Sequence, residues 1–172
     1  MKILKYPHPM LTTPADRIET VDDAVRETAE EMLMAMAEAR GLGLAGPQVG
    51  YGKRLICVNI TPGSPEGEKV YINPEVVGRE GEATAEEGCL SLPHVNGKIT
   101  RPAKVIVNAT DLKGEAVTIH ADSLLARVLQ HEIDHLDGVL ITQRFSAFDK
   151  AANARSLRAL EKAAKEASAG RR

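Results

Sequence analysis

The chain has 172 residues, of which 43% are hydrophobic and 27% are charged, and its formal net charge is −2 at neutral pH. This length suits one domain whose core can fold without staples, so we expect a single domain over residues 1–172. No apolar run approaches the roughly 18 residues of a membrane span, and no signal-peptide core precedes the first prolines. The two cysteines are too few for a disulfide framework, which favours a reducing, cytoplasmic setting.

The charge is unevenly distributed along the chain. Residues 146–172 contain seven Lys or Arg and three acidic residues, a local charge of +4, so the rest of the chain carries −6. A basic appendage on an acidic body could contact an acidic partner such as ribosomal RNA. A solvated helix with ion pairs along it explains the same pattern, and charge alone favours this simpler interpretation.

The N-terminal part predicts an extended start followed by a helix. Residues 7–14 are proline-rich and should be extended, because proline disfavours a helix interior. Asp22 or Asp23 can cap a helix that runs to about Ala39, and the glycines within 41–43 should end it. The methionines that should fill the core from this helix are Met32, Met34 and Met36.

The glycine-rich segment 41–50 (GLGLAGPQVG) does not have the pattern of a phosphate-binding loop. No strand precedes it and no Gly-Lys-Ser/Thr follows, so we expect no nucleotide cofactor. Glycines also let a backbone approach a ligand closely. Gln48 adds a neutral amide donor, which is suited to stabilising an oxyanion. Taken alone, the segment would be no more than a turn.

The middle of the chain predicts short strands, because β-branched runs alternate with turn residues. The predicted strands are residues 54–60, 70–74, 75–77, 104–110 and 115–120. Pro74 should break the second strand from the third, and the last two strands should form a hairpin. Cys57, within the first strand, is best interpreted as a small buried hydrophobe.

A helix with metal-binding spacing follows the strands. The apolar run 124–129 indicates a helix, which Gly138 should end. His131 and His135 are four residues apart, so both rings leave the same helical face, as two ligands of one divalent metal must. Glu132 lies close enough to reach a metal-bound water without binding the metal. The motif therefore supplies two metal ligands and a candidate general base.

The third metal ligand decides the class of enzyme. In zinc endopeptidases it lies downstream, but Ile141 occupies the position of the next metzincin histidine and no histidine follows His135. Glu161 is the first later glutamate, and its basic neighbours indicate a surface face. Upstream, Cys89 can present a thiolate from the end of a strand, a good ligand for Fe(II) or Zn(II). A buried free cysteine is the simpler interpretation of Cys89 alone; together with the histidines we favour it as the ligand.

These elements predict an α+β fold, because strands precede helices without regular alternation. We expect short-stranded sheets, mixed or antiparallel, around a central metal-binding helix, with further helices toward both termini. The last helix, roughly residues 147–167, is alanine-rich and amphipathic and lies within the basic helix and tail of residues 146–172.

Three motifs together resemble those of peptide deformylases. They occur in the family's order, as GLGLAGPQ at 41–48, EGCLS at 87–91 and QHEIDH at 130–135, and the resemblance covers nearly the whole chain. The spacing is similar to that of the type I branch common in bacteria. One position departs from the pattern, since Gly46 stands where the family usually has alanine, and we expect the missing methyl to loosen that turn slightly.

The resemblance implies a role for the residues of each motif. The metal ligands that it implies are Cys89, His131 and His135. The metal would be Fe2+ in most members, with Zn2+, Ni2+ or Co2+ able to substitute, and a water would complete the site. Glu132 would take a proton from that water and pass it to the leaving amine. The side chain of Gln48 and the backbone N–H of Leu90 would stabilise the oxyanion.

The activity that the resemblance implies is removal of formate from the N-terminal formyl-methionine of new polypeptides by a single catalytic domain. The substrate contacts that it implies are Gly43 and Glu87. Helical spacing places Leu124 and Val128 on the metal-facing side, where with Leu42 they can line an apolar pocket for a methionine side chain. Arg127 would contribute its aliphatic stem. Ordinary core packing is the alternative for Leu124 and Val128.

Two other functions remain open from sequence. A zinc endopeptidase would use Glu161 as its third ligand. A metal-stabilised ribosome-binding module would use the basic terminal helix as its contact and would need neither Gln48 nor Glu132. The expected partners are formyl-methionyl nascent peptides, with the ribosome as a further candidate and with no membrane.

Overall fold

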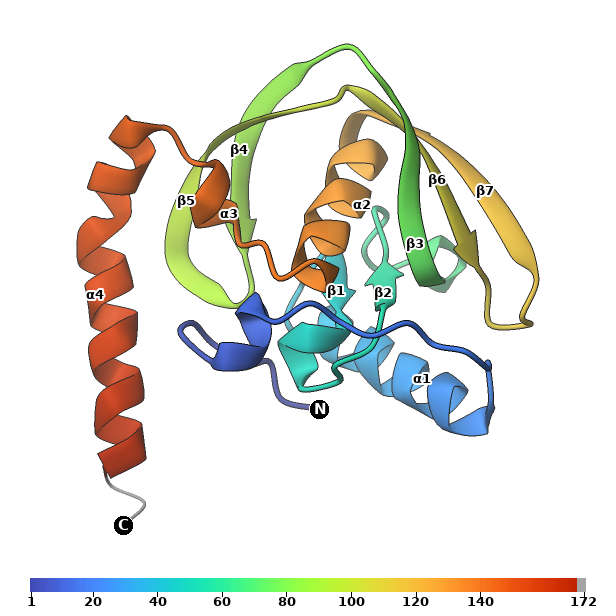
Figure 1. Cartoon of the computed structure of the whole chain (residues 1–172), viewed down its shortest axis with the longest axis horizontal. Coiled ribbons are helices and arrows are strands. Elements are labelled where there is room, and N and C mark those ends of the chain that lie inside the picture. The colour runs from blue at the N-terminus through green and yellow to red at the C-terminus, as the bar shows by residue number, and fades with distance from the viewer. Residues whose placement is uncertain (170–172) are drawn as a thin grey trace.

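The structure is a computed structural model that describes residues 1–169, so Arg171 and Arg172 of the predicted basic tail lie outside the described residues. Helices and strands alternate irregularly along the chain (Figure 1). In chain order, with η for 3-10 helices, the elements are η1 Pro9–Thr12, α1 Asp23–Glu38, β1 Gly43–Ala45, η2 Gly46–Val49, β2 Leu55–Val58, η3 Pro65–Gly67, β3 Lys69–Glu80, β4 Ala83–Cys89, β5 Leu92–Arg101, β6 Lys104–Thr110, β7 Ala116–Asp122, α2 Ser123–Leu136, α3 Ile141–Arg144 and α4 Ala147–Ala169.

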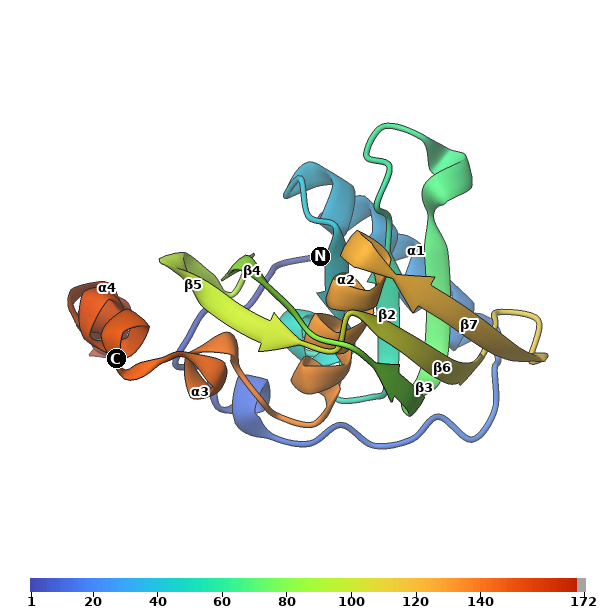
Figure 2. The same ribbon diagram turned by 90° about the horizontal axis from the view of Figure 1, so that it is seen from above.

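The strands form two sheets with α2 between them. The larger sheet has the order β1-β2-β3-β6-β7, the smaller is the β4–β5 hairpin, and every neighbouring pair is antiparallel. Figure 2 shows α2 flanked by the hairpin on one side and the larger sheet on the other, with α4 beyond β5. The predicted α+β class and the central position of the motif helix are confirmed. Among the described residues, no helix has the length and hydropathy that crossing a bilayer requires.

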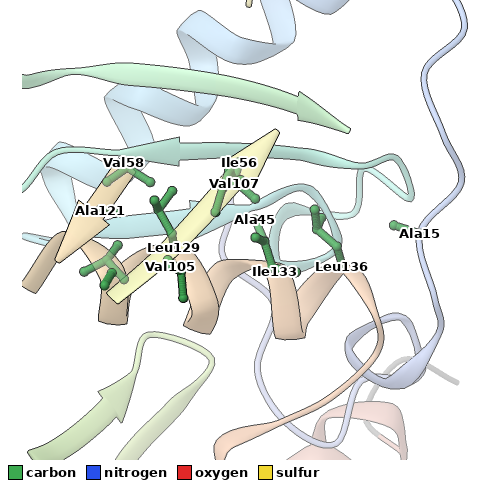
Figure 3. Packing of buried hydrophobic residues seen from close by; sticks show 12 residues of the cluster. Ala15, Ala45, Ile56, Val58, Val105, Val107, Ala121, Leu129, Ile133 and Leu136 are labelled. Carbon is green, nitrogen blue, oxygen red and sulfur yellow. The ribbon is translucent and has the colours of Figure 1, made fainter. Parts of the chain in front are cut away.

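Apolar packing fixes the rotation of α2. Leu129, Ile133 and Leu136 point from α2 toward the larger sheet (Figure 3). The sheet residues in the same cluster include Ala45, Ile56, Val58, Val105 and Val107. Burial of each large aliphatic side chain contributes about 1.5–3 kcal/mol. Because His131 and His135 lie on another side of the helix, this packing directs both imidazoles toward β4.

The helix predicted from Asp22 or Asp23 is confirmed. Asp22 is the N-cap of α1, and its side chain accepts a hydrogen bond from the Val25 N–H. Met32 and Met36 are fully buried in its core face, but Met34 is 59% exposed, so the prediction of core packing is wrong for Met34. The reason is periodicity, since residues two apart on a helix lie on different faces.

Two predictions that rest on proline are wrong. The prediction of extended backbone is wrong for Pro9–Thr12, which form η1, because proline suits the first position of a helix and the His8 side chain caps it. Pro74 does not break the sheet. β3 continues past it as one strand, with a register shift between Ile72 and Glu75 that accommodates the missing N–H.

Candidate metal and catalytic site

Three predicted ligands converge between the hairpin and α2. One ligand atom from each of Cys89, His131 and His135 lies within 4.8 Å of the other two. The Cys89 Sγ is 3.2 Å from His135 Nε2, and the two imidazole centroids are 5.0 Å apart. Cys89 ends β4, as expected for a thiolate presented from a strand end. One sulfur and two imidazole nitrogens form a donor set that fits Fe(II) or Zn(II) and leaves room for an exchangeable ligand.

The orientation of His131 is set by Glu87. The Glu87 Oε2 lies 3.0 Å from His131 Nδ1, which leaves Nε2 directed at the cluster. Arg101 donates to both Glu87 oxygens, at 2.6 and 2.9 Å, and also to Asp134 at 2.8 Å. Burial opposes ionisation of Glu87, but hydrogen bonds from His131 and Arg101 outweigh it and lower the pKa of Glu87 to about 2. Glu87 is therefore a carboxylate that orients one of the candidate metal-ligand histidines.

The two histidines differ in their protonation in the metal-free protein. Burial disfavours the charged form of His131, but hydrogen bonds with Cys89 and Glu87 outweigh it and raise the pKa of His131 to about 10. Burial and the charge of His131 hold the pKa of His135 well below its usual value. A metal binds only neutral imidazole, so a metal held at His131 would compete with this proton.

Glu132 combines burial with a free oxygen atom. Its side chain is 4% exposed, and Oε2 has no hydrogen-bond partner among the described residues. Burial raises the pKa of Glu132 to about 7, despite the opposing charge of His131. A Cβ atom at Gly43 would overlap the Glu132 carboxylate, so only glycine leaves space for this group. A carboxyl with a pKa near neutrality is suited to accepting and returning a proton.

The Gln48 amide is held in one orientation. Its Oε1 accepts from the Ala45 N–H at 2.8 Å, so its NH2 group faces the cluster, 3.6 Å from Cys89 Sγ and 3.2 Å from Ser91 Oγ. Gln48 and Ser91 are fully buried. Ser91 was not singled out from the sequence. Its place directly after the Cys-Leu pair of the second motif was the available signal.

A cavity of about 520 Å³ opens beside the cluster. The predicted substrate-binding residues all line it, namely Leu42, Gly43, Glu87, Leu124 and Val128. The predicted catalytic residues Gln48, Leu90 and Glu132 line it as well. Leu124 is 45% exposed and Val128 is 8% exposed, which places Leu124 at the mouth and Val128 deeper in the wall.

Glu161, the alternative third ligand, is outside the site. Its Oε1 accepts from the Tyr6 hydroxyl at 2.9 Å, and it lines a separate cavity with Lys5 and Lys165. Among residues 1–169, the group with metal-ligand spacing contains Cys89 and not Glu161. The endopeptidase arrangement is therefore wrong, because the helix that carries Glu161 packs against the outer strand β5.

Gly46 tightens its turn and does not loosen it. A Cβ atom there would lie 2.6 Å from the carbonyl oxygens of both Tyr51 and Lys53. The Tyr51 N–H also donates to the Gly46 carbonyl at 3.0 Å. The expectation from sequence was wrong because it considered the missing methyl without the neighbouring loop, whose backbone occupies that space.

Comparisons with known proteins agree with this geometry. The sequence model of the family described as "Polypeptide deformylase" matches residues 1–151. A peptide deformylase of Acidobacterium capsulatum is 43% identical over 162 residues, covering 94% of this chain and 95% of that protein. One of Chromobacterium violaceum is 43% identical and covers 85% and 87%.

Solved structures give the same result. A Plasmodium falciparum peptide deformylase has a TM-score of 0.93 at 33% identity, covering 96% of this chain and 98% of that one. Peptide deformylase 1B of Arabidopsis thaliana, in complex with an inhibitor, has a TM-score of 0.94 at 34% identity and covers 98% and 94%. The similarity therefore extends over both sheets and the helix between them.

Proposed function

Because this chain belongs to the polypeptide deformylase family and is an enzyme that removes the N-formyl group from nascent peptides, we propose that Cys89, His131 and His135 hold its catalytic metal. Their convergence within 4.8 Å is the observation that carries the proposal. Fe2+ is the proposed resident ion, with Zn2+, Ni2+ or Co2+ able to replace it. A metal bound there would acidify water and polarise the formyl carbonyl.

Glu132 is the proposed proton carrier. Its unpartnered Oε2 accepts a proton from the attacking water and then delivers it to the leaving amine. The raised pKa supports both transfers near neutral pH. Gly43 permits this position of the carboxylate, because a Cβ atom there would overlap it.

Gln48 and Leu90 are the proposed oxyanion donors. The Gln48 NH2 group is directed at the cluster because its carbonyl end is bound to Ala45. The Leu90 N–H belongs to the turn after Cys89, and both residues line the cavity. Donors that are fixed before the reaction stabilise developing negative charge without reorganising.

The substrate is proposed to bind as an added strand. Among residues 1–169, β1 pairs only with β2, so the other edge of β1 is free, and Gly43 of β1 lines the cavity. An extended peptide can use such an edge for backbone hydrogen bonds. The methionine side chain would then enter the cavity between Leu42, Leu124 and Val128, whose apolar surfaces suit a thioether. Glu87 also lines this cavity, and its carboxylate binds the neighbouring side chains of Arg101, Arg127 and His131.

The activity and the general base can be tested together. Anaerobically prepared, Fe2+-loaded protein should release formate from formyl-Met-Ala-Ser, and Glu132→Gln should release almost none while retaining its metal. Release by Glu132→Gln at the wild-type rate would remove Glu132 from the mechanism. Absence of release from the metal-loaded wild type would refute the assignment of this substrate.

A cytoplasmic location and docking of α4 on the ribosome are also proposed. Among its described residues, α4 buries only Asn153 fully, and Phe148 is 80% exposed, so the helix offers a free basic and apolar surface. Truncation after Phe148 should abolish cosedimentation with ribosomes at low salt. Unchanged cosedimentation of a truncated protein that still releases formate would refute the docking proposal.

A further inference from the structure

Arg127 lies beside the cavity, one turn of α2 before His131, and makes three hydrogen bonds to the β4–β5 hairpin. Its Nη1 donates to Glu87 Oε1 at 2.6 Å and to the Ile99 carbonyl at 3.0 Å, and its Nη2 donates to the Ala83 carbonyl at 2.6 Å. The side chain is 13% exposed. One guanidinium therefore joins both strands of the hairpin to the helix that carries the histidines.

The two arginines on Glu87 occupy different sides of it. Arg101 is 3% exposed, binds both Glu87 and Asp134, and lines a polar cavity behind α2. Arg127 lines the cavity in front of α2, where Leu124 and Val128 also lie. Arg101 therefore supports the carboxylate from behind, and Arg127 binds it on the side of the cavity that both residues line.

The Arg127 guanidinium has unused donors. A guanidinium carries five N–H groups, and the bonds to Glu87, Ile99 and Ala83 use three of them. The Nε–H and one N–H of Nη2 have no protein partner among the described residues. A thioether sulfur is a weak hydrogen-bond acceptor, whereas the methylene that replaces it in norleucine accepts nothing.

We propose that Arg127 is a specificity-determining and positioning residue. It supplies the polar part of the pocket for the first substrate side chain, where it favours a thioether over an alkyl chain of the same shape. Through Glu87 it also keeps His131 directed at the metal. This inference rests on the proposed function of the cavity and extends it, because the residues Leu42, Leu124 and Val128 select for apolarity alone.

The test compares formyl-Met-Ala-Ser with formyl-norleucine-Ala-Ser in the wild type, Arg127→Met, Arg127→Lys and a control, Arg158→Met, on α4. A hydrogen bond contributes about 0.5–1.5 kcal/mol net, and sulfur is a weak acceptor, so the wild type should prefer methionine by about 2- to 10-fold in kcat/KM. Arg127→Met should lower this ratio to about one, and Arg127→Lys should restore part of it. Arg158→Met should keep the wild-type ratio. A ratio that changes in Arg127→Met and not in this control cannot be explained by a general loss of stability.

Cobalt titration of the metal-free protein provides a second readout. Loss of the group that hydrogen-bonds a metal-ligand histidine typically costs 10- to 100-fold in metal affinity, and Arg127 acts one contact further away, through Glu87. Arg127→Met should therefore weaken Co2+ binding and alter the visible spectrum of the bound ion, and Arg158→Met should do neither.

The outcomes separate this inference from the proposed function. A wild-type ratio of about one, or an unchanged ratio in folded Arg127→Met, overturns the specificity role. Unchanged Co2+ affinity and spectrum overturn the positioning role. Absence of formate release from either peptide by the wild type refutes the proposed function instead, and the Co2+ titration still decides whether Arg127 positions His131.

Discussion

The backbone N–H of Leu4 donates to the carbonyl oxygen of Gln48 at 2.7 Å. In the next residue, the Lys5 ammonium donates to the Leu90 carbonyl at 2.6 Å. Residues 4–6 therefore join the two separate segments that carry the proposed oxyanion donors. This short segment bridges Gln48 and Leu90 in addition to the direct Gln48–Ser91 hydrogen bond, although neither is near it in the sequence.

We predict that Lys5→Met lowers kcat and leaves KM nearly unchanged. One hydrogen bond contributes about 1 kcal/mol, which corresponds to about a fivefold loss in kcat if the bond acts on the oxyanion donors. Lys5→Arg should retain most of the activity, and Lys2→Met serves as the control. Steady-state kinetics with formyl-Met-Ala-Ser decide the matter, and a higher KM with an unchanged kcat would contradict the prediction.

Gly46→Ala should destabilise the protein, although peptide deformylases usually have alanine at this position of the first motif. The added Cβ would be 2.6 Å from the Tyr51 and Lys53 carbonyl oxygens, so the loop must move. Overpacking of this kind costs about 1–3 kcal/mol in the free energy of unfolding. Urea unfolding measures it. Gly52→Ala is the matched control, because nothing lies within 4 Å of a Cβ there, and an equal effect of both changes would contradict the prediction.

Arg101→Met should be strongly destabilising. Arg101 neutralises Glu87 and Asp134, and its side chain is 3% exposed. Removing one partner from a buried ion pair costs about 3–5 kcal/mol when the remaining charge is uncompensated. Because Arg127 still binds Glu87 and Arg144 still binds Asp134, we expect a loss toward the lower end of that range. The control is Arg17→Met, whose partner Glu75 is as exposed as Arg17 itself, and exposed pairs contribute at most about 1 kcal/mol. Urea unfolding measures both changes. An equal loss of stability in Arg101→Met and Arg17→Met would refute the distinction between the buried and the exposed ion pair.

The sequence was sufficient for features that depend on nearby residues. The N-cap Asp22 and the spacing of His131 and His135 each act within about one helical turn, so α1 and the common face of the two α2 histidines could be predicted. The hairpin of β6 and β7 could also be predicted, since a short turn and clean alternation define it locally.

The β4–β5 hairpin could not be predicted in the same way. Most of β4 is exposed and contains Glu86 and Glu87, so it lacks the apolar alternation that marks a strand. The buried partners of Glu87 come from other elements. Arg101 ends β5 and His131 lies on α2, and no local pattern distinguishes a buried arginine from a solvated one.

The two cysteines should react very differently with iodoacetamide. Cys57 is fully buried, and burial raises the pKa of its thiol well above the usual value, so it stays protonated in the folded protein. Cys89 lines the cavity and is partly exposed. Mass spectrometry of the metal-free protein at pH 8 should show modification of Cys89 alone, and prior loading with Zn2+ should protect it.

The same burial of Cys57 gives a pH dependence of stability. Its pKa is raised in the folded state, so above the unfolded thiol pKa of about 8.5 the unfolded chain loses a proton that the folded protein keeps. Stability from this group is complete below that pH and decreases as pH rises above it. Urea unfolding from pH 7 to 10 should show a smaller alkaline loss in Cys57→Ala than in the wild type. Equal slopes, or modification of Cys57 in the folded protein, would contradict the assignment of Cys57 to the core.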